Sequence, residues 1–310
     1  MTGASLPRIA DYGLIGDCHG AALVSRAGSI DWCCLPRFDS GSVFARLLDP
    51  ERGGHCAVIP AGLDPERTTR AYVGDTLVLA TTLHGADGEV VVTDCMTLGE
   101  RGPRDPRRRL LRIVEGRRGC VPLDIEVVPR FDYGDVRPWL LMHGPGLATA
   151  TGGDDALELA CDHELESGDD FDLHAHAELE PGERLRLSIA YVPPELLDEH
   201  GPQQPTPEEL DALLDQTVEW WRAWAEHVHD RDVDPEGVMR SALTLKALTY
   251  EPTGAIIAAP TTSLPERLGG EANWDYRYSW VRDSSFSSRS LRPLEGALLV
   301  GAGPRAAARR

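Results

Sequence analysis

The sequence predicts an antiparallel β-sandwich in residues 9–192, followed by helices. Three observations support this fold class. Residues 9–192 contain short apolar or alternating runs separated by turn signals, which is typical of a sandwich. The composition changes at Pro193, where a loop rich in proline and glutamine begins. From about Thr206 the apolar residues recur at helical spacing.

The strand pattern is clearest where turn residues interrupt it. Ala86, Asp87 and Gly88 form a favourable hairpin turn because Asp-Gly stands between two β-rich runs. Gly119 ends a second, weaker turn signal after two arginines. The runs that predict strands are found at residues 22–35, 76–96, 109–131 and 185–192.

Thr206 marks the predicted start of a long helix. Proline follows it and acidic residues fill the first turn, as expected for an N-cap. Trp221 and Trp224 lie at helical spacing, and Trp220 is next to them. The three rings could form a sugar platform, but a buried helical stripe explains the spacing better. Residues 235–250 predict a second helix.

The length and charge limit the possible functions. A chain of 310 residues can bury a large core and usually forms two domains. Its formal net charge is −19, the opposite of what nucleic-acid binding requires. An acidic surface suits an enzyme with a neutral substrate. No apolar run approaches the ~18–20 residues of a membrane span.

The cysteines and the N-terminus predict a cytoplasmic location. Seven cysteines are irregularly spaced and form no C-x-x-C pair, so we expect buried free thiols. The first 13 residues lack the basic and apolar regions of a signal peptide. A reducing compartment is the expected setting.

Residues 270–283, GEANWDYRYSWVRD, form the most informative segment. Aromatic rings recur within it although only 6% of the chain is aromatic. Arginine and aspartate alternate with the rings. The apolar face of a pyranose stacks on such rings, while its hydroxyls need charged or polar partners at fixed positions. The alternative is a buried aromatic segment with structural ion pairs.

The order of residues in this segment resembles the signature of glycoside hydrolase family 15, the glucoamylases and the bacterial glucoamylase-like trehalases. Three other segments resemble the same family. Residues 9–49 resemble the start of its N-terminal domain, residues 129–139 a mid-domain element, and residues 241–266 the segment before the signature. The resemblance covers most of residues 9–286.

The resemblance implies a domain order. Residues 1–192 would form a trehalase-like N-terminal β-sandwich, and residues 193–234 a linker loop and helix. Residues 235–288 would begin an (α/α)6 toroid, with an inner helix over residues 273–288. Residues 289–310 would be an aberrant tail, so the fold class is a β-sandwich followed by the first helices of a truncated toroid.

The resemblance also implies the site residues. Arg282 and Asp283 match the pair that holds the hydroxyls of a terminal glucose, in the subsite on the non-reducing side of the scissile bond. Tyr276 and Trp280 match aromatic residues that line the same pocket. The remaining residues of the signature would support these four from behind; they are Trp274, Asp275, Arg277 and Tyr278.

No catalytic residue can be assigned. The family hydrolyses glycosides with inversion, which requires one carboxyl group as acid and another as base. The family's two glutamates lie well downstream of the signature, and neither Glu266 nor Glu271 matches them. After Phe286 the sequence becomes rich in arginine, alanine and glycine. This change predicts a frameshift or truncation near Ser287.

Other candidate sites are weaker. His174 and His176 share one strand face but lack further metal ligands, so neither a metal nor a cofactor is expected. Residues 31–40 could form a loop that leans from the sandwich onto the catalytic mouth. The alternative is a buried strand followed by a tight loop, with Arg37 and Asp39 satisfied locally. The basic run at residues 101–112 is expected to be a solvated turn.

Three functions remain open. The first is a glycoside hydrolase that acts with inversion on trehalose or α-glucan oligosaccharides in the intact family. We expect this chain to be truncated and inactive alone, because neither catalytic glutamate can be assigned in it. The second is a non-catalytic carbohydrate-binding or scaffold protein that uses the sandwich. The third is a non-functional remnant. The expected partner is a glucoside or oligosaccharide, with no nucleic acid and no membrane, and the sequence indicates no oligomeric state.

Overall fold

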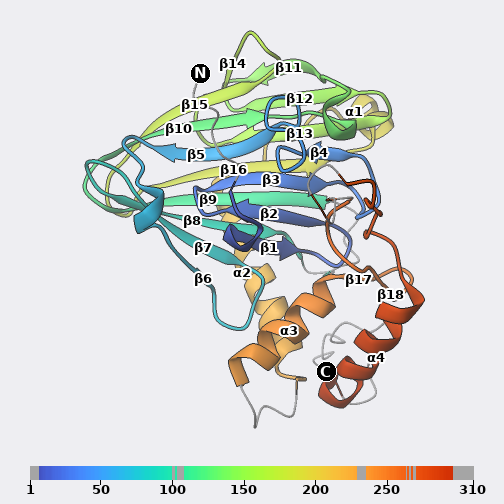
Figure 1. The fold of residues 1–310 in the computed structure, drawn as a ribbon. Coiled ribbons are helices and arrows are strands. Elements are labelled where there is room, and N and C mark those ends of the chain that lie inside the picture. Colours follow the sequence, from blue (N-terminus) through green and yellow to red (C-terminus); the bar gives the residue numbers. More distant parts are fainter. Residues whose placement is uncertain are drawn as a thin grey trace, which may run out of the picture.

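The computed structural model describes residues 7–99, 102, 108–228, 235–262, 264, 267 and 270–295. Within these residues, two eight-stranded antiparallel sheets face each other. Figure 1 shows helices α2, α3 and α4 gathered below one end of this sandwich. The predicted order of a β-sandwich followed by helices is confirmed.

The first sheet, called sheet A, has the strand order β1-β2-β3-β5-β10-β15-β14, and β4 pairs with β3. Its strands are β1 (Tyr12–Gly16), β2 (Ala21–Ser25), β3 (Ser29–Cys34), β4 (Ser42–Phe44), β5 (His55–Pro60), β10 (Val121–Val128), β14 (Glu166–Ser167) and β15 (Leu173–Leu179).

The second sheet, called sheet B, has the strand order β11-β12-β13-β16-β9-β8-β7-β6. Its strands are β6 (Thr69–Tyr72), β7 (Leu79–His84), β8 (Glu89–Met96), β9 (Arg108–Arg118), β11 (Trp139–Gly144), β12 (Leu147–Gly152), β13 (Asp155–Cys161) and β16 (Arg184–Tyr191). Short 3-10 turns are η1 (Ile9–Asp11), η2 (Pro65–Arg67) and η4 (Asp132–Gly134).

The main core lies between the two sheets. Ile125 on sheet A and Leu157 and Ile189 on sheet B belong to one buried cluster. Along β10, buried residues alternate with more exposed ones, as expected when one strand face packs and the other meets solvent. Ala86, Asp87 and Gly88 connect β7 to β8, which confirms the predicted hairpin.

A buried ion pair of sheet B borders this core. Its arginine belongs to the basic run at residues 101–112, and the prediction of a solvated turn is wrong for residues 108–112, which lie in β9. Arg112 on β9 and Asp94 on β8 are fully buried, with 2.7 Å between Nε and Oδ1. The Arg112 guanidinium also donates to the carbonyls of Gly28 and Cys56, each at 2.7 Å. Because Gly28 and Cys56 belong to sheet A and its turns, this side chain joins the two sheets through hydrogen bonds.

Helix α2 (Pro207–Ala225) begins as the sequence predicts. Thr206 accepts a hydrogen bond from the Glu209 amide, and the Glu209 carboxylate accepts one from the Thr206 amide. Leu210 packs on Val78, Cys95, Leu111 and Ile113 of sheet B. The predicted buried stripe is confirmed, because Trp221 and Trp224 are 0% and 7% exposed. A further short helix, α1 (Pro194–His200), lies within the segment predicted to be a loop.

The remaining elements follow α2. Helix α3 (Pro235–Ala247) ends three residues earlier than predicted, because Thr249–Tyr250 forms β17 and pairs with β18 (Ala255–Ile256). Helix α4 spans Val281–Glu295. In the described ranges, no helix is long and apolar enough to cross a membrane.

The prediction of a helix over residues 273–288 is wrong for its first half, since α4 starts only at Val281. The carbonyls of Tyr276 and Tyr278 accept hydrogen bonds from the amides of Ala259 and Ala258, at 2.9 and 3.1 Å. Carbonyls paired with a distant segment are not free for the bonds of a helix. The segment before Val281 is therefore extended.

The backbone stays helical past residue 289, through Glu295. Residues 296–310 lie outside the described part of the chain, as does Glu266. The frameshift or truncation near Ser287 stays a prediction. The same holds for the aberrant packing of residues 289–310.

Replacing Arg112 tests the buried ion pair of sheet B. We expect Arg112→Ala to lower the free energy of unfolding by about 3–5 kcal/mol, because it leaves the Asp94 carboxylate buried without its partner. Arg117→Ala, on the same strand, is the control; its pair with Glu115 is half exposed and contributes about 0–1 kcal/mol. Urea unfolding measures the free energy of unfolding of both variants. Equal losses would show that the buried pair contributes no more to stability than the exposed pair.

Candidate active site

The four residues predicted to contact sugar lie together where the extended segment meets α4. The rings of Tyr276 and Trp280 are stacked, with 5.5 Å between centroids and 15° between planes. The Arg282 guanidinium lies 5.8 Å from the centroid of the Trp280 ring. Its Nη2 is 3.3 Å from Oδ2 of Asp283. The structure thus brings two rings and one ion pair into one cluster.

These groups remain accessible to a ligand. The side chains of Arg282 and Asp283 are 68% and 37% exposed, and the two stacked rings are half-buried. Asp283 lies in the first turn of α4, where the helix dipole favours a carboxylate. A sugar placed here would meet an aromatic face, five guanidinium donors and two carboxylate acceptors.

The segment is anchored through Arg277, whose side chain is 5% exposed. Its guanidinium donates to the carbonyls of Ser40 and Phe38 at 2.7 and 3.2 Å, and to the Sγ of Cys34 at 3.4 Å. These three acceptors belong to the sandwich. The same guanidinium lies 5.6 Å from the ring centroid of Tyr133. One side chain of the signature is therefore inserted into the first domain.

Asp275 completes this anchor. Its carboxylate accepts hydrogen bonds from Nε and Nη2 of Arg277, at 3.0 and 2.7 Å. Burial by itself raises the pKa of Asp275, but the hydrogen bonds from Arg277 outweigh it, so the pKa lies below its ordinary value. Asp275 is therefore ionised at neutral pH and has no proton to give to a leaving group.

A second set of contacts joins the signature to the sandwich. The indole Nε1 of Trp32, a fully buried residue of β3, donates to the carbonyl of Pro260 at 2.8 Å. Residues 258 and 259, just before Pro260, carry the amides that bind the carbonyls of Tyr276 and Tyr278. Together with Arg277, these bonds fix the extended segment relative to β3.

The loop of Arg37 and Asp39 fits both predicted alternatives, a local ion pair and a contact with the signature. The two side chains form a local bidentate pair, with both N–O distances at 2.9 Å. The Arg37 guanidinium also lies 5.3 Å from the ring centroid of Tyr250. Since the carbonyls of neighbouring Phe38 and Ser40 bind Arg277, the loop is both locally satisfied and in contact with the signature.

The expected supporting residues divide into two groups. Asp275 and Arg277 do support the segment from behind. The side chains of Trp274 and Tyr278 are 60% and 52% exposed, and their supporting role stays a prediction. Trp32 lies in the segment 31–40, which was predicted to lean onto the catalytic mouth as one of two alternatives, but the sequence did not indicate its hydrogen bond to Pro260.

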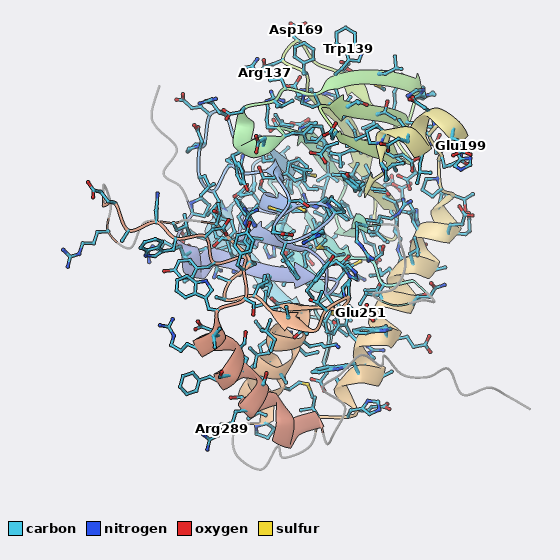
Figure 2. All side chains as sticks on the ribbon, turned by 90° about the vertical axis from the view of Figure 1, so that its right-hand side faces the viewer. Arg137, Trp139, Asp169, Glu199, Glu251 and Arg289 are labelled. Carbon is cyan, nitrogen blue, oxygen red and sulfur yellow. The ribbon has the colours of Figure 1, made fainter. Side chains whose placement is uncertain are left out.

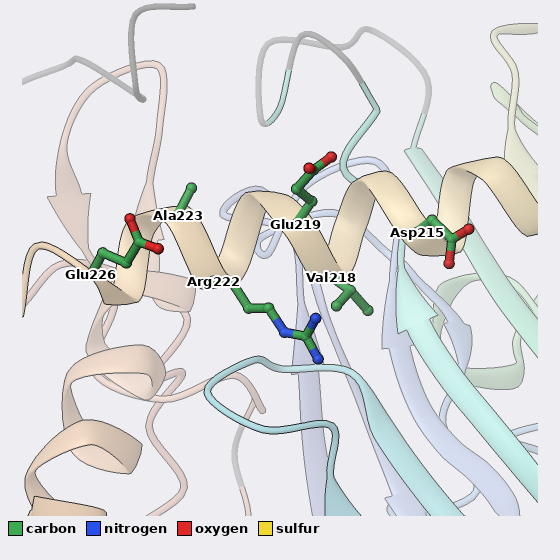
Figure 3. Close-up of a pocket in the computed structure, with 6 residues that line it drawn as sticks. All are labelled: Asp215, Val218, Glu219, Arg222, Ala223 and Glu226. Atoms are coloured by element: carbon green, nitrogen blue, oxygen red, sulfur yellow. The ribbon is translucent and has the colours of Figure 1, made fainter.

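Other hollows lie elsewhere. Figure 3 shows one of about 580 Å³ along α2. Asp215, Glu219, Arg222 and Glu226 line it, and all four are exposed. Acidic and basic residues three or four apart are typical of a solvated helix face. None of the four predicted sugar-binding residues lines this hollow.

The two predicted strand histidines each contact a separate carboxylate. His174 lies 3.1 Å from Asp172, and His176 lies 2.6 Å from Asp124. In the residues that the structure describes, no group of three or more potential metal ligands occurs.

Two family models match the chain. The one described as "Trehalase-like, N-terminal" matches residues 1–187, and "Glycosyl hydrolases family 15" matches residues 232–294. A trehalase of Mycolicibacterium smegmatis is 38% identical over 93% of this chain and 45% of its own length. A trehalase of Thermoplasma volcanium is 32% identical over 94% of the chain and 45% of its own length. The chain thus spans about half the length of these curated relatives.

A solved structure described as a putative kojibiose phosphorylase from human microbiome gives a TM-score of 0.40 at 10% identity. It covers 79% of this chain, and the match takes up 40% of that structure. This likeness is too low to indicate a function.

Removing the anchor tests its role in seating the signature. In Arg277→Ala we expect the amides of Ala258 and Ala259 to exchange about tenfold faster or more. The loss of one charged hydrogen bond, roughly 1.5–3 kcal/mol, is enough for this effect. Arg282→Ala is the control, because Arg282 is exposed. Hydrogen exchange with mass spectrometry measures both variants; unchanged exchange in Arg277→Ala would mean that other contacts seat the segment.

Proposed function

The chain belongs to glycosyl hydrolase family 15 and carries a trehalase-like N-terminal domain, and on this premise we propose that it binds the terminal glucose of an α-linked glucoside. One observation carries the proposal. Tyr276, Trp280, Arg282 and Asp283, which lie one to four positions apart in the sequence, form a single accessible cluster.

The chemistry of this cluster suits glucose. The stacked rings offer an apolar face for the axial C–H bonds of a pyranose. The Arg282–Asp283 pair can donate to one hydroxyl and accept from the next, and hydrogen bonds with charged groups are stronger than neutral ones. An electron-rich Tyr276 ring beside the sugar would also favour an oxocarbenium-like transition state. The first two features bind the sugar; the third acts only during reaction.

The substrate class follows from the relatives. The two relatives described above are named trehalases, so we propose trehalose as the first candidate and α-glucan oligosaccharides as the second. Both present the same terminal glucose to the cluster. Groups that contact the other side of the scissile bond decide between them, and no described residue is assigned to that role.

We propose that these 310 residues hold sugar but do not hydrolyse it alone. Inverting hydrolysis needs a carboxylic acid and a separate carboxylate about 6.5–9.5 Å apart. In the described part of the signature, Asp275 is bound to Arg277 and Asp283 is paired with Arg282. Each is therefore engaged in another role. Binding groups by themselves lower the energy of the bound substrate as much as that of the transition state.

A reducing, cytoplasmic setting belongs to the same proposal. All seven cysteines are free thiols in the structure, and six of them are buried. A reducing compartment keeps thiols in this state.

The second candidate is a carbohydrate-binding or scaffold protein that works without catalysis. The observation that favours it is the size of the sandwich, which has its own core and needs no helix of the second domain to close it. Under this hypothesis the cluster around Trp280 would be dispensable.

Asp283→Ala separates the two candidates. Residues 1–286 can be joined to the remaining part of the M. smegmatis trehalase to give a complete family domain. We expect the chimera to release glucose from trehalose, and Asp283→Ala to lower kcat/KM about 10- to 150-fold. That range corresponds to one hydroxyl contact with a charged partner, roughly 1.5–3 kcal/mol. Asp39→Ala is the matched control, and an equal kcat/KM in all three proteins would refute the sugar-binding role.

The 310-residue chain itself should release no glucose from trehalose, maltose or maltotriose. The reason is that both aspartates in the described part of the signature are paired with arginines. Glucose release is measured with a coupled assay, and the same preparation carrying Asp283→Ala controls for contaminating enzymes. Turnover that disappears in the Asp283→Ala protein would show that the chain holds a catalytic pair of its own.

A further inference from the structure

A second group of exposed aromatic residues lies at the end of the sandwich opposite α4. Trp139 on the edge strand β11 is 69% exposed, and Phe171 is 39% exposed. Their ring centroids are 6.5 Å apart and their planes are tilted by 48°. Figure 2 shows Trp139 with Arg137 and Asp169 at the top of the molecule, far from α4 at the bottom. This pair of rings is called the aromatic platform.

The loop that carries Phe171 is held in place from inside the protein. Arg130 is 4% exposed, and its guanidinium donates to the carbonyls of Asp170 and Phe171 at 2.7 and 3.0 Å. It also donates to the Asp170 carboxylate at 3.0 Å. The buried Arg130 thus donates three hydrogen bonds to an exposed loop.

The backbone of this loop is strained. Phe171 has φ of 54°, in the left-handed region that a bulky residue rarely adopts. Such a conformation persists only where the surroundings impose it, and it is concentrated at functional sites. Here the bonds from Arg130 impose it, and the result is that the Phe171 ring stands beside Trp139 in solvent.

Polar groups border the two rings. Arg137 and Asp170 form an ion pair, and their side chains are 57% and 59% exposed. Asp169 is exposed next to them. Sugar recognition needs this combination, because the rings stack on C–H faces while guanidinium and carboxylate groups bind hydroxyls.

We propose that the aromatic platform is a surface binding site for an α-linked glucan, separate from the candidate active site. The tilt of 48° between the rings suits a chain whose successive sugars turn relative to one another, as α-linked glucoses do. Coplanar rings would instead suit a flat β-linked chain. The net charge of −19 opposes binding to nucleic acid or to anionic lipid.

The apolar surface is too small to form a stable dimer interface with a second copy of the chain. The platform itself offers only the rings of Trp139 and Phe171. Leu141 lies outside the platform, and it is 51% exposed on the same face of β11. Large side chains bury about 150–250 Å² each, whereas a stable dimer buries about 800 Å² per partner. Two rings with charged neighbours match the dimensions of a few sugar units instead.

The test is affinity electrophoresis of the 310-residue chain in native gels that contain glycogen. We expect glycogen to retard the chain and Trp139→Ala to raise the apparent Kd about tenfold or more, as for an aromatic residue that dominates an interface. Leu141→Ala is the matched control, since it removes an exposed apolar side chain from the same strand face without touching the ring pair. It should leave the Kd unchanged.

Four results would overturn the proposal, the last of them from gels that contain hydroxyethylcellulose. In the first, Trp139→Ala retains the wild-type Kd for glycogen. In the second, Leu141→Ala weakens binding as much as Trp139→Ala, which would indicate unspecific apolar adhesion. In the third, Asp283→Ala abolishes retardation, which would place glycogen in the candidate active site. Hydroxyethylcellulose gels test the linkage, and equal retardation there would exclude selectivity for α-linked chains.

Discussion

The guanidinium of Arg277 determines where the candidate active site stands. This buried group joins Asp275 on its own segment to the backbone of the loop after β3, at Phe38 and Ser40. A buried charge is tolerated only when its donors are satisfied. The signature segment and the loop after β3 must therefore keep their relative position. The stacked rings of Tyr276 and Trp280 lie on either side of Arg277 in the chain and take their position from it. The sandwich therefore acts as the support of the site.

Two loops of the sandwich with the same tetrapeptide sequence meet at this anchor. Pro-Arg-Phe-Asp occurs at residues 36–39 and again at residues 129–132. The first loop supplies carbonyls to Arg277, and the second leads into Tyr133, whose ring lies beside the same guanidinium. Ser42 after the first loop accepts a hydrogen bond from the Tyr133 amide at 2.9 Å. Two adjacent loops that share this tetrapeptide therefore lie around the Arg277 side chain.

The second of these loops also leads to the aromatic platform. Arg130, within the tetrapeptide, holds the loop of Phe171, and β11 with Trp139 begins a few residues later. One segment of the sandwich therefore contributes to surfaces at both ends of the molecule. A protein that binds a long glucan at one end and a chain terminus at the other would gain effective concentration from this arrangement.

The sequence by itself determined the local features of this protein. Strand alternation, the Asp-Gly turn and the capping box at Thr206 depend on neighbouring residues, so they could be predicted without a structure. The order of residues around Trp280 also identified the four residues that cluster. Only the tertiary structure decided that residues before Val281 are extended, that Arg277 enters the sandwich and that Phe171 adopts a left-handed backbone. Each depends on partners far away in the chain, such as Ser40 for Arg277, 237 positions apart. No local pattern of residues encodes such a partner, because packing of the whole fold brings the two together.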